Sequence, residues 1–318
     1  MRNLKGNILL LITTLLWGLA FTAQSAAADN IGSFTFNFVR CLLAAVFLAV
    51  VYAVKLIYDR INKKQVNNYN WKRMFEAGFF CGFTMFFGMN LQQFGIAAYP
   101  VGTAAAGRAG FLTATYVVMI PVFQRLRGKK LSLAVILGVI GCMTGMYLLC
   151  MSGGFSGIYL GDILVIGCAI GYTAYILVVD KYSDCSGIAV SIIQFIVCGI
   201  MCMIGMFFTE KPDPAVIADA WLPVVYAGVV SSGIGYTLQI IGQKYAEPTV
   251  ASIIMSLESV FAALFGWVIL SEMLSIRELA GCGLVFFSVI AAQIPDMVRN
   301  STKKSKETQY SDNSIKQS

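Results

Sequence analysis

The feature that most constrains this sequence is a series of apolar segments, each about 20 residues long, that runs along almost the entire chain. That length is what a helix needs to cross a lipid bilayer. Only 12% of the 318 residues are charged, and the mean hydropathy is +0.75. A water-soluble core of this size could not hide so much apolar surface. The sequence therefore predicts an all-α integral membrane protein with the lipid bilayer as its surroundings.

Ten transmembrane helices are predicted, joined by connections too short to form a domain. They cover residues 6–26, 34–58, 74–95, 103–123, 131–151, 161–179, 186–208, 221–243, 249–270 and 276–294. The polar parts are a basic loop over 59–72 and a tail over 297–318, whose composition predicts a disordered segment.

The distribution of lysine and arginine predicts the orientation, because positively charged flanks stay on the cytoplasmic side. If the N-terminus is cytoplasmic, almost all of the 23 basic residues are cytoplasmic too, and Lys211 and Arg277 lie on the outer side. An even number of helices returns the C-terminus to the cytoplasm. We therefore expect a multi-pass protein of the cell membrane with both termini inside. The net charge of +7 reflects this topology and predicts no nucleic-acid partner.

The two halves of the chain resemble each other. Residues 6–21 align with 161–176, which matches Trp17 to Tyr172, and NLQQF at 90–94 aligns with TLQII at 237–241. The predicted units are residues 1–152 and 153–296, followed by the tail at 297–318. Five helices in each unit give the units opposite orientations in the membrane. Inverted repeats of this kind are typical of transporters, although gene duplication also produces membrane proteins that do not transport.

Four stretches resemble the EamA-like branch of the drug/metabolite transporter superfamily. They are Trp17-Gly18, Arg40, AGFLTATYVVMIPVF at 109–123 and PTVASIIMSLESVFAALFGWVILSEMLS at 248–275. The resemblance implies two inverted five-helix repeats, both termini inside and a role as an exporter or importer of metabolites. It also implies that the solute is an amino acid, a related metabolite or an amphipathic drug, and that the direction of transport is export.

Among the ionisable residues inside predicted helices three stand out, because a charge there costs a few kcal/mol unless it faces protein or water. Arg40 and Arg108 are candidates to hold an anionic group of the solute, since a guanidinium offers paired donors to two oxygens. Glu258 is a candidate for coupling, because a carboxyl group in a low dielectric can exchange a proton near neutral pH. The alternatives are that Glu258 pairs with an arginine to hold helices together, and that Arg40 extends to water at the outer interface.

Further candidates for the solute site are polar or aromatic: Trp17, Asn90, Gln92, Tyr172, Tyr236 and Gln239. Gln92 corresponds to Gln239 across the repeat, as Trp17 does to Tyr172, so a pseudo-twofold axis would place both pairs near one centre. Such groups can bind a metabolite through hydrogen bonds and a stacking face. The alternative is that they hold helices together in lipid.

These features predict a secondary active transporter that moves a small-molecule solute by alternating access. If Glu258 is the coupling residue, protons are the coupling ion. The chain contains no phosphate-binding GxxxxGK[ST] motif and no histidine, so we expect no ATP hydrolysis, no cofactor and no enzyme activity. The alternative is a non-transporting scaffold or a lipid-modifying enzyme on the same fold.

Overall fold

The structure is a computed structural model that describes residues 2–28, 31–62, 70–100, 105–151, 158–270 and 275–292. These residues form helices, and no strand occurs among them. The helices are α1 (Arg2–Ala28), α2 (Ser33–Ile61), α3 (Trp71–Ala97), α4 (Ala105–Thr113), α5 (Tyr116–Leu126), α6 (Leu133–Cys150), α7 (Leu160–Lys181), α8 (Gly187–Thr209), α9 (Pro214–Asp219), α10 (Trp221–Val225), the π-helix η1 (Tyr226–Tyr236), α11 (Thr237–Gln243), α12 (Pro248–Met255) and α13 (Leu257–Leu270). A last helix covers residues 276–292.

Each of the ten predicted segments falls on one or more of these helices, which confirms the all-α membrane class. Seven helical segments within the described residues are long and apolar enough to cross a membrane. Two further apolar helices, Leu133–Leu148 and Pro248–Ala262, are shorter. The total of ten crossings therefore stays a prediction. The predicted tail at 297–318 lies outside the described residues.

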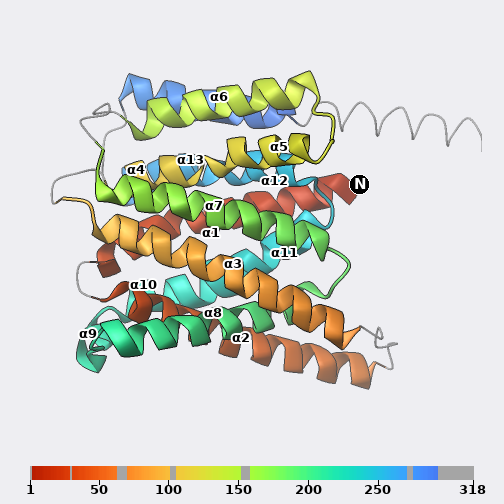
Figure 1. Cartoon of the computed structure of the whole chain (residues 1–318), viewed down its shortest axis with the longest axis vertical. Helices are drawn as coiled ribbons and strands as arrows, with labels where there is room; N and C mark the ends of the chain where they lie inside the picture. The colour runs from red at the N-terminus through yellow and green to blue at the C-terminus, as the bar shows by residue number, and fades with distance from the viewer. Residues whose placement is uncertain are drawn as a thin grey trace, which may run out of the picture.

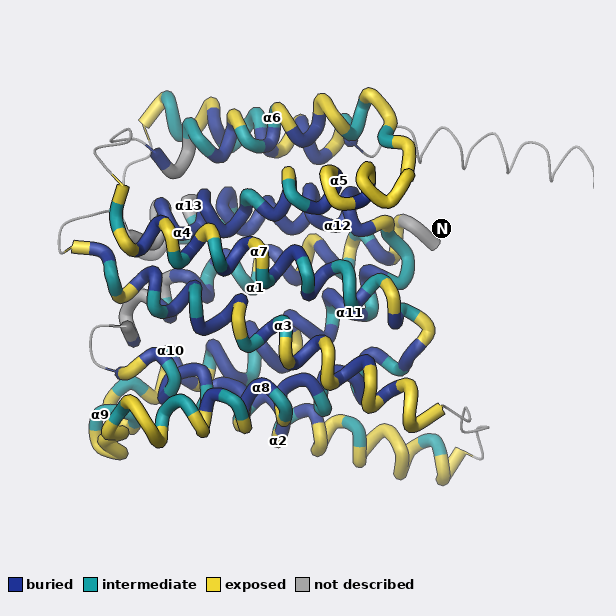
Figure 2. The backbone as a smooth tube through the Cα atoms, in the orientation of Figure 1, coloured by how far each residue is buried: buried dark blue, intermediate teal, exposed yellow. Residues whose placement is uncertain are grey.

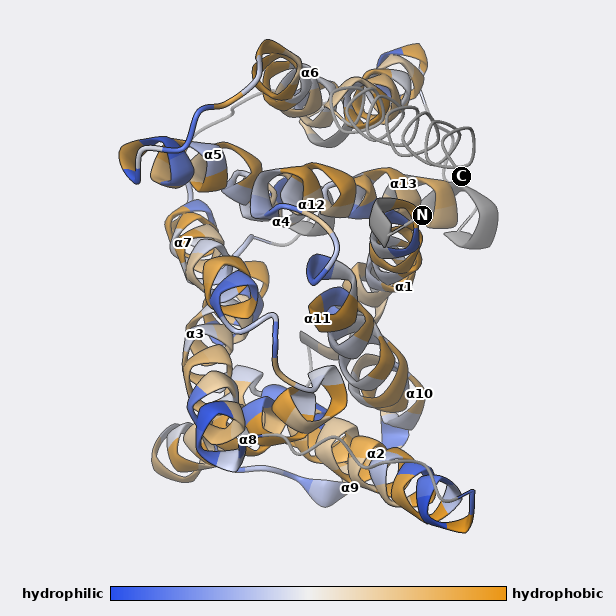
Figure 3. Cartoon of the chain, turned by 90° about the vertical axis from the view of Figure 1, so that its right-hand side faces the viewer, coloured by the Kyte–Doolittle hydropathy of each residue, from blue (hydrophilic) through white to orange (hydrophobic). Residues whose placement is uncertain are grey.

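The helices run roughly parallel and antiparallel to one another, so their ends gather at two opposite ends of the bundle (Figure 1). The N-terminus and the connections α2–α3, α5–α6, α7–α8 and α11–α12 share one end. Figure 3 looks onto that end, where hydrophilic segments cap helices whose flanks are apolar. We call it the N-terminal end; the basic residues Lys5, Lys72, Lys129, Lys181 and Lys244 all lie in segments at this end.

Apolar side chains cover the outside of the bundle as well as its interior. Exposed residues concentrate on α2, α6 and other outer helices (Figure 2), and many of them are large and apolar, such as Ile57, Phe75 and Leu137. This distribution suits a protein surrounded by lipid.

Inside the bundle, α3 packs along α7 and α8, and α1 packs along α13, η1 and α11. Glycines allow two of these contacts: a Cβ atom on Gly161 would lie 2.7 Å from the Gly95 carbonyl oxygen, and one on Gly6 would lie 2.9 Å from that of Gly242. Close backbone approach at small residues is typical of helix packing in membranes.

Three of the predicted segments are irregular. The segment at 103–123 divides into α4 and α5, and the segment at 249–270 divides into α12 and α13. At each break a hydroxyl group donates to the carbonyl oxygen three residues earlier, from Thr115 to Leu112 at 2.6 Å and from Ser256 to Ile253 at 2.7 Å. Such bonds bend helices. The segment at 221–243 contains the π-helix η1, a form that is rare and often lies at functional sites.

Candidate functional site

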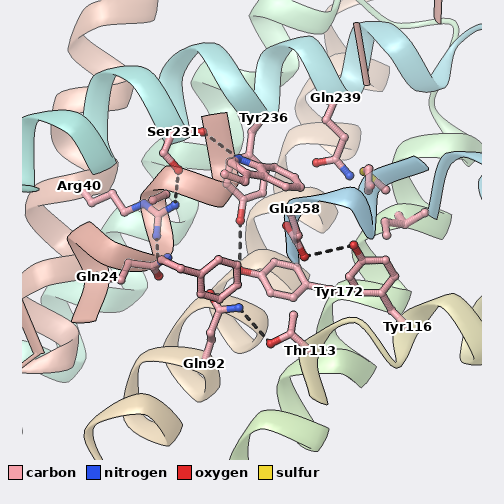
Figure 4. Close-up of a pocket in the computed structure, with 15 residues that line it drawn as sticks. Gln24, Arg40, Gln92, Thr113, Tyr116, Tyr172, Ser231, Tyr236, Gln239 and Glu258 are labelled. Atoms are coloured by element: carbon pink, nitrogen blue, oxygen red, sulfur yellow. Dashed lines mark hydrogen bonds between the residues drawn. The ribbon is translucent and has the colours of Figure 1, made fainter. Parts of the chain in front are cut away.

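The irregular segments meet around a central cavity with an empty volume of about 460 Å³. Helices from both halves of the chain line it (Figure 4). The lining residues are Trp17, Ala20, Phe21, Gln24, Arg40, Gln92, Thr113, Tyr116, Tyr172, Ile176, Ser231, Tyr236, Gln239, Met255 and Glu258. Thr113 and Tyr116 flank the α4–α5 break, and Met255 and Glu258 flank the α12–α13 break. The breaks therefore deliver polar groups to the cavity that an unbroken apolar helix would not.

Arg40, on α2, is 3% exposed, and its hydrogen bonds go to neutral groups alone among the described residues. Its Nη1 atom donates to Gln24 Oε1 at 3.3 Å and its Nη2 atom to Ser231 Oγ at 3.1 Å. Its Nε atom donates to the Ala227 carbonyl oxygen at 3.2 Å and to Ser232 Oγ at 2.5 Å. The side chain thus turns into the protein and does not extend to water at the interface.

The π-helix explains part of this arrangement. Each residue of a π-helix bonds to a partner five positions away, so the turn is wider and its carbonyl groups are easier to reach. The carbonyl group of Ala227 accepts from Arg40, and that of Ser231 accepts from Trp17 Nε1 at 3.1 Å. The irregular helix therefore holds both an arginine and a tryptophan at the cavity wall.

Arg40 retains donors for a ligand. A guanidinium has five N–H groups, two of them on each Nη atom. Since Nη1 and Nη2 each donate a single bond to the described residues, each keeps one further N–H. Two such donors suit the two oxygens of a carboxylate. The cationic group has no ion-pair partner within the described part of the chain.

Aromatic rings form one wall of the cavity. The rings of Trp17 and Tyr236 lie 4.7 Å apart between centroids, and Tyr172 Oη and Tyr236 Oη are hydrogen-bonded at 3.1 Å. Tyr175 and Phe195 pack edge-on against the ring of Tyr236 from behind, at 5.8 and 5.9 Å. This support fixes the orientation of the wall that a bound solute would contact.

The two amides that correspond across the repeat both reach the cavity. Gln92 Nε2 donates to Thr113 Oγ1 at 3.1 Å, so the amide nitrogen of Gln92 has a hydrogen-bond partner. Gln239 is 1% exposed, and its Oε1 atom has no hydrogen-bond partner among the described residues. A buried acceptor without a donor is costly, so a donor group on a bound solute would stabilise it.

Glu258 lies on the α13 side of the cavity and is 4% exposed. The hydroxyl group of Tyr116 donates to its Oε1 atom at 3.3 Å (Figure 4). Glu258 forms no ion pair with another described residue and belongs to none of the pairs Lys55–Asp59, Arg73–Asp184 and Arg108–Asp162. The alternative in which Glu258 pairs permanently with an arginine therefore does not match this structure.

Two of the predicted site residues, Asn90 and Arg108, lie away from the cavity lining. Asn90 accepts a hydrogen bond from Asn37 at 3.1 Å and donates to the Phe86 carbonyl oxygen and to Cys202 Sγ. These are contacts between and within helices. Seven predicted residues, namely Trp17, Arg40, Gln92, Tyr172, Tyr236, Gln239 and Glu258, do lie together around the cavity.

Arg108 forms a buried ion pair with Asp162. Its Nε atom lies 2.6 Å from Asp162 Oδ1 and its Nη2 atom 2.7 Å from Oδ2, and both side chains are 7% exposed. Tyr99 also donates to Asp162 Oδ1 at 2.9 Å, and the guanidinium lies 4.8 Å from the ring of Tyr159. The carboxylate thus binds the N–H groups of the guanidinium, and the Tyr159 ring provides a cation–π contact.

Five residues at the cavity or beside Arg108 were not predicted from the sequence: Asp162, Gln24, Thr113, Tyr116 and Ser231. Asp162 and Gln24 had a signal: the first is an acidic residue at the beginning of an apolar segment, and the second is an amide near the end of one. Thr113, Tyr116 and Ser231 had none, because the helix irregularities that direct them are not visible in hydropathy.

The fold and the cavity define a polytopic α-helical membrane protein with a polar site enclosed between its helices. Comparisons with known proteins then specify the family. The profile of the EamA-like transporter family matches residues 4–151 and again residues 159–292. The chain belongs to the EamA-like family, which points to a membrane transporter.

A relative and a solved structure are consistent with this assignment. An uncharacterized transporter from Archaeoglobus fulgidus is 28% identical over 296 residues, which cover 92% of this chain and 87% of the relative. A protein of known crystal structure is similar with a TM-score of 0.72 and 16% sequence identity, over 91% of this chain and 96% of the other. At that identity the likeness concerns the fold.

Proposed function

We propose that the protein is a secondary active transporter that exports a small metabolite by alternating access through the central cavity. The observation that carries this proposal is that the cavity encloses a cationic Arg40 and a carboxyl group on Glu258 that are not paired with each other. Buried charged groups that only held the helices together would be expected to pair. Groups kept available in an enclosed polar site are suited to a ligand.

The lining suggests the chemistry of the solute. Arg40 would hold a carboxylate or another anionic group through its two remaining N–H donors. The rings of Trp17 and Tyr236 would contact its apolar part, and Gln239 would accept a hydrogen bond from one of its donors. An amino acid or a related metabolite carries these groups. An amphipathic drug is included in the proposal because the aromatic wall provides an apolar surface.

Alternating access would follow from two inverted units, 1–152 and 153–296. The packing supports this view, because equivalent contacts occur in pairs. Gly161 at the beginning of α7 meets Gly95 near the end of α3, and Gly6 at the beginning of α1 meets Gly242 near the end of α11. The Gly161–Gly95 contact lies where α7 begins and α3 ends, toward one end of the bundle, and the Gly6–Gly242 contact lies where α1 begins and α11 ends, toward the other. Alternate loosening of two such contacts would expose the cavity to each side in turn.

We further propose that Glu258 couples transport to protons. Its carboxyl group faces the cavity, and Tyr116 is its hydrogen-bond partner among the described residues. A carboxyl group in this position can bind a proton on one side of the membrane and release it on the other. The proposal places the protein in the cell membrane with both termini in the cytoplasm, which the concentration of basic residues at the N-terminal end supports.

Uptake into proteoliposomes tests this function. Amino acids and other metabolites would be screened with and without an imposed pH gradient, in vesicles in which the protein orientation has been determined. We expect gradient-dependent flux of at least one solute, and loss of the gradient dependence in Glu258→Gln. If Glu258→Gln responds to the gradient as the wild type does, Glu258 is not the coupling group. If no solute is transported, the result favours the alternative of a scaffold or a lipid-modifying enzyme.

A further inference from the structure

A second hollow lies at the N-terminal end of the bundle, between α5, α6, α12 and the helix at 276–292. Its empty volume is about 930 Å³, and it shares no lining residue with the central cavity. Its polar lining consists of Gln124, Lys129, Lys130, Ser132, Glu247 and Thr249. The transport proposed for the central cavity does not explain why these polar residues line a second hollow.

The turn between α5 and α6 brings the lysines to the hollow. Gly128 adopts φ +82°, a left-handed conformation that glycine accepts without strain. The Lys129 N–H then bonds back to the Gln124 carbonyl oxygen at 3.1 Å. Neither Lys129 nor Lys130 takes part in an ion pair among the described residues. Two lysine charges are therefore held beside one hollow without a neutralising carboxylate in contact.

Two helix N-termini add to the positive potential there. The helix α6 begins at Leu133 after its capping residue Ser132, and α12 begins at Pro248. The N-terminus of a helix carries a partial positive charge and free backbone N–H groups. Ser132 caps one of these N–H groups by accepting from Val135 at 3.3 Å. The remaining groups, together with the lysines, favour an anion.

One carboxylate lines the hollow beside the two lysines, so its charged lining residues, Lys129, Lys130 and Glu247, sum to +1. Glu247 lines the hollow as the residue before α12, and Asp180 on α7 lies within electrostatic reach of Lys129. Gln124 is 5% exposed, and its side chain has no hydrogen bond to another described residue, so its amide is available to a ligand. Amide and ammonium donors beside helix N-termini are the groups that proteins use for phosphate oxygens.

We propose that this hollow binds a phosphate group, and its position favours the headgroup of an anionic phospholipid. It lies at the end of the bundle where lipid headgroups meet a membrane protein. Leu126 and Leu133, 80% and 70% exposed on either side of the lysine-bearing turn, would contact the acyl chains. Basic pockets between membrane helices are suited to anionic headgroups, each nearby lysine adding to the attraction.

Native mass spectrometry of the full chain, with phosphatidylglycerol or phosphatidylcholine added, tests the proposal. The variant Lys129→Gln/Lys130→Gln is compared with Lys55→Gln/Lys72→Gln, which removes the same charge from the same end of the bundle but away from the hollow. We expect the wild type and the control to bind one phosphatidylglycerol equally well and in preference to phosphatidylcholine. The Lys129/Lys130 variant should bind it roughly 10- to 30-fold more weakly.

A second experiment identifies the source of the phosphate. Inorganic phosphate is added to each protein in a detergent without phospholipid, and the unfolding midpoint is measured. The site is assigned to lipid if lipid binding depends on Lys129 and Lys130 and inorganic phosphate stabilises none of the proteins. It is assigned to soluble phosphate if inorganic phosphate stabilises the wild type and the control but not the Lys129/Lys130 variant. The proposal is overturned if neither ligand distinguishes the Lys129/Lys130 variant from the control.

Discussion

Two arginines occupy similar positions in the sequence, each near the beginning of a membrane helix, but their surroundings in the structure differ. Arg108 is neutralised by Asp162 through two short contacts, and Tyr99 and Tyr159 lie beside the pair. Arg40 contacts amide, hydroxyl and carbonyl groups alone among the described residues and lines the central cavity.

The difference separates a structural arginine from one suited to binding. A buried charge with a carboxylate partner already has its stabilising interaction, and a ligand would have to displace that partner. A buried charge with neutral partners is solvated by dipoles but not neutralised. An anionic ligand supplies the missing charge. Burial alone, which is similar for the two arginines, does not distinguish these roles.

The largest effect is expected from Asp162→Asn. This change leaves the Arg108 cation buried without its carboxylate, and breaking such a pair costs about 3 kcal/mol or somewhat more. We expect the free energy of unfolding, measured by denaturant titration in detergent, to fall by about that amount. The double variant Arg108→Gln/Asp162→Asn, which buries no charge at this position, should regain most of the loss. A stable single variant would show that the pair contributes little.

The next effect concerns solute binding by Arg40. In Arg40→Gln, no cation remains in the cavity to hold an anionic group, and the loss of a charge-assisted hydrogen bond costs about 1.5–3 kcal/mol. We expect the KM for an anionic or zwitterionic solute to rise roughly 10- to 100-fold. Unfolding should be less affected than by Asp162→Asn, because no charge is left unpaired. Arg40→Lys should be intermediate, since it keeps the charge but loses the paired donors.

A smaller effect is expected at the aromatic wall. Tyr236→Phe removes the bond to Tyr172 Oη at 3.1 Å but keeps the ring against Trp17. One neutral hydrogen bond contributes about 1 kcal/mol, so KM should change roughly fivefold. Tyr172→Phe removes the same bond from the other side. If that bond is what matters, the double variant should cost no more than either single change; additive losses would point to separate solute contacts.

The smallest effect is expected for the exposed pair of Arg73 and Asp184, whose two-point geometry resembles that of Arg108 and Asp162. The Arg73 guanidinium lowers the pKa of Asp184 below its ordinary value. The pair therefore adds stability above the ordinary pKa of an aspartate, about 3.9, and loses it as the pH falls through the lower, folded-state value. Because the Asp184 side chain is 58% exposed, solvent screens the pair strongly.

For Asp184→Asn we accordingly expect a shift of the unfolding midpoint near the limit of detection at neutral pH, and none in strongly acidic buffer. A shift comparable to that of Asp162→Asn would contradict the idea that burial makes the difference between the two pairs. The measurement is a series of thermal unfolding curves over pH, with the wild type beside the variant.

The membrane class, the helical segments and seven of the residues that line the cavity could be predicted from the sequence, because hydropathy and internal repetition indicate them directly. Trp17 and Tyr172, like Gln92 and Gln239, were predicted to approach one centre, and all four line the cavity. Repeat correspondence was informative here because it carries three-dimensional information that composition lacks.

The different hydrogen-bond and ion-pair partners of Arg40 and Arg108 could not be predicted from the sequence. It depends on Asp162, which is distant in sequence from Arg108, and on the π-helix that directs Ala227 and Ser231 toward Arg40. Hydropathy registers the length of an apolar segment but neither its helix type nor its partners. For the same reason Thr113 and Tyr116, which flank a helix break, did not stand out.

A single transport assay most directly tests whether Arg40 binds the solute and Arg108 is structural. A solute found in the screen is measured in proteoliposomes with the wild type, Arg40→Gln and the Arg108→Gln/Asp162→Asn double variant, at matched amounts of folded protein. We expect Arg40→Gln to lower uptake at low solute concentration by at least roughly tenfold, while the double variant stays within about threefold of the wild type. Normal uptake by Arg40→Gln together with loss in the double variant would contradict this division of roles.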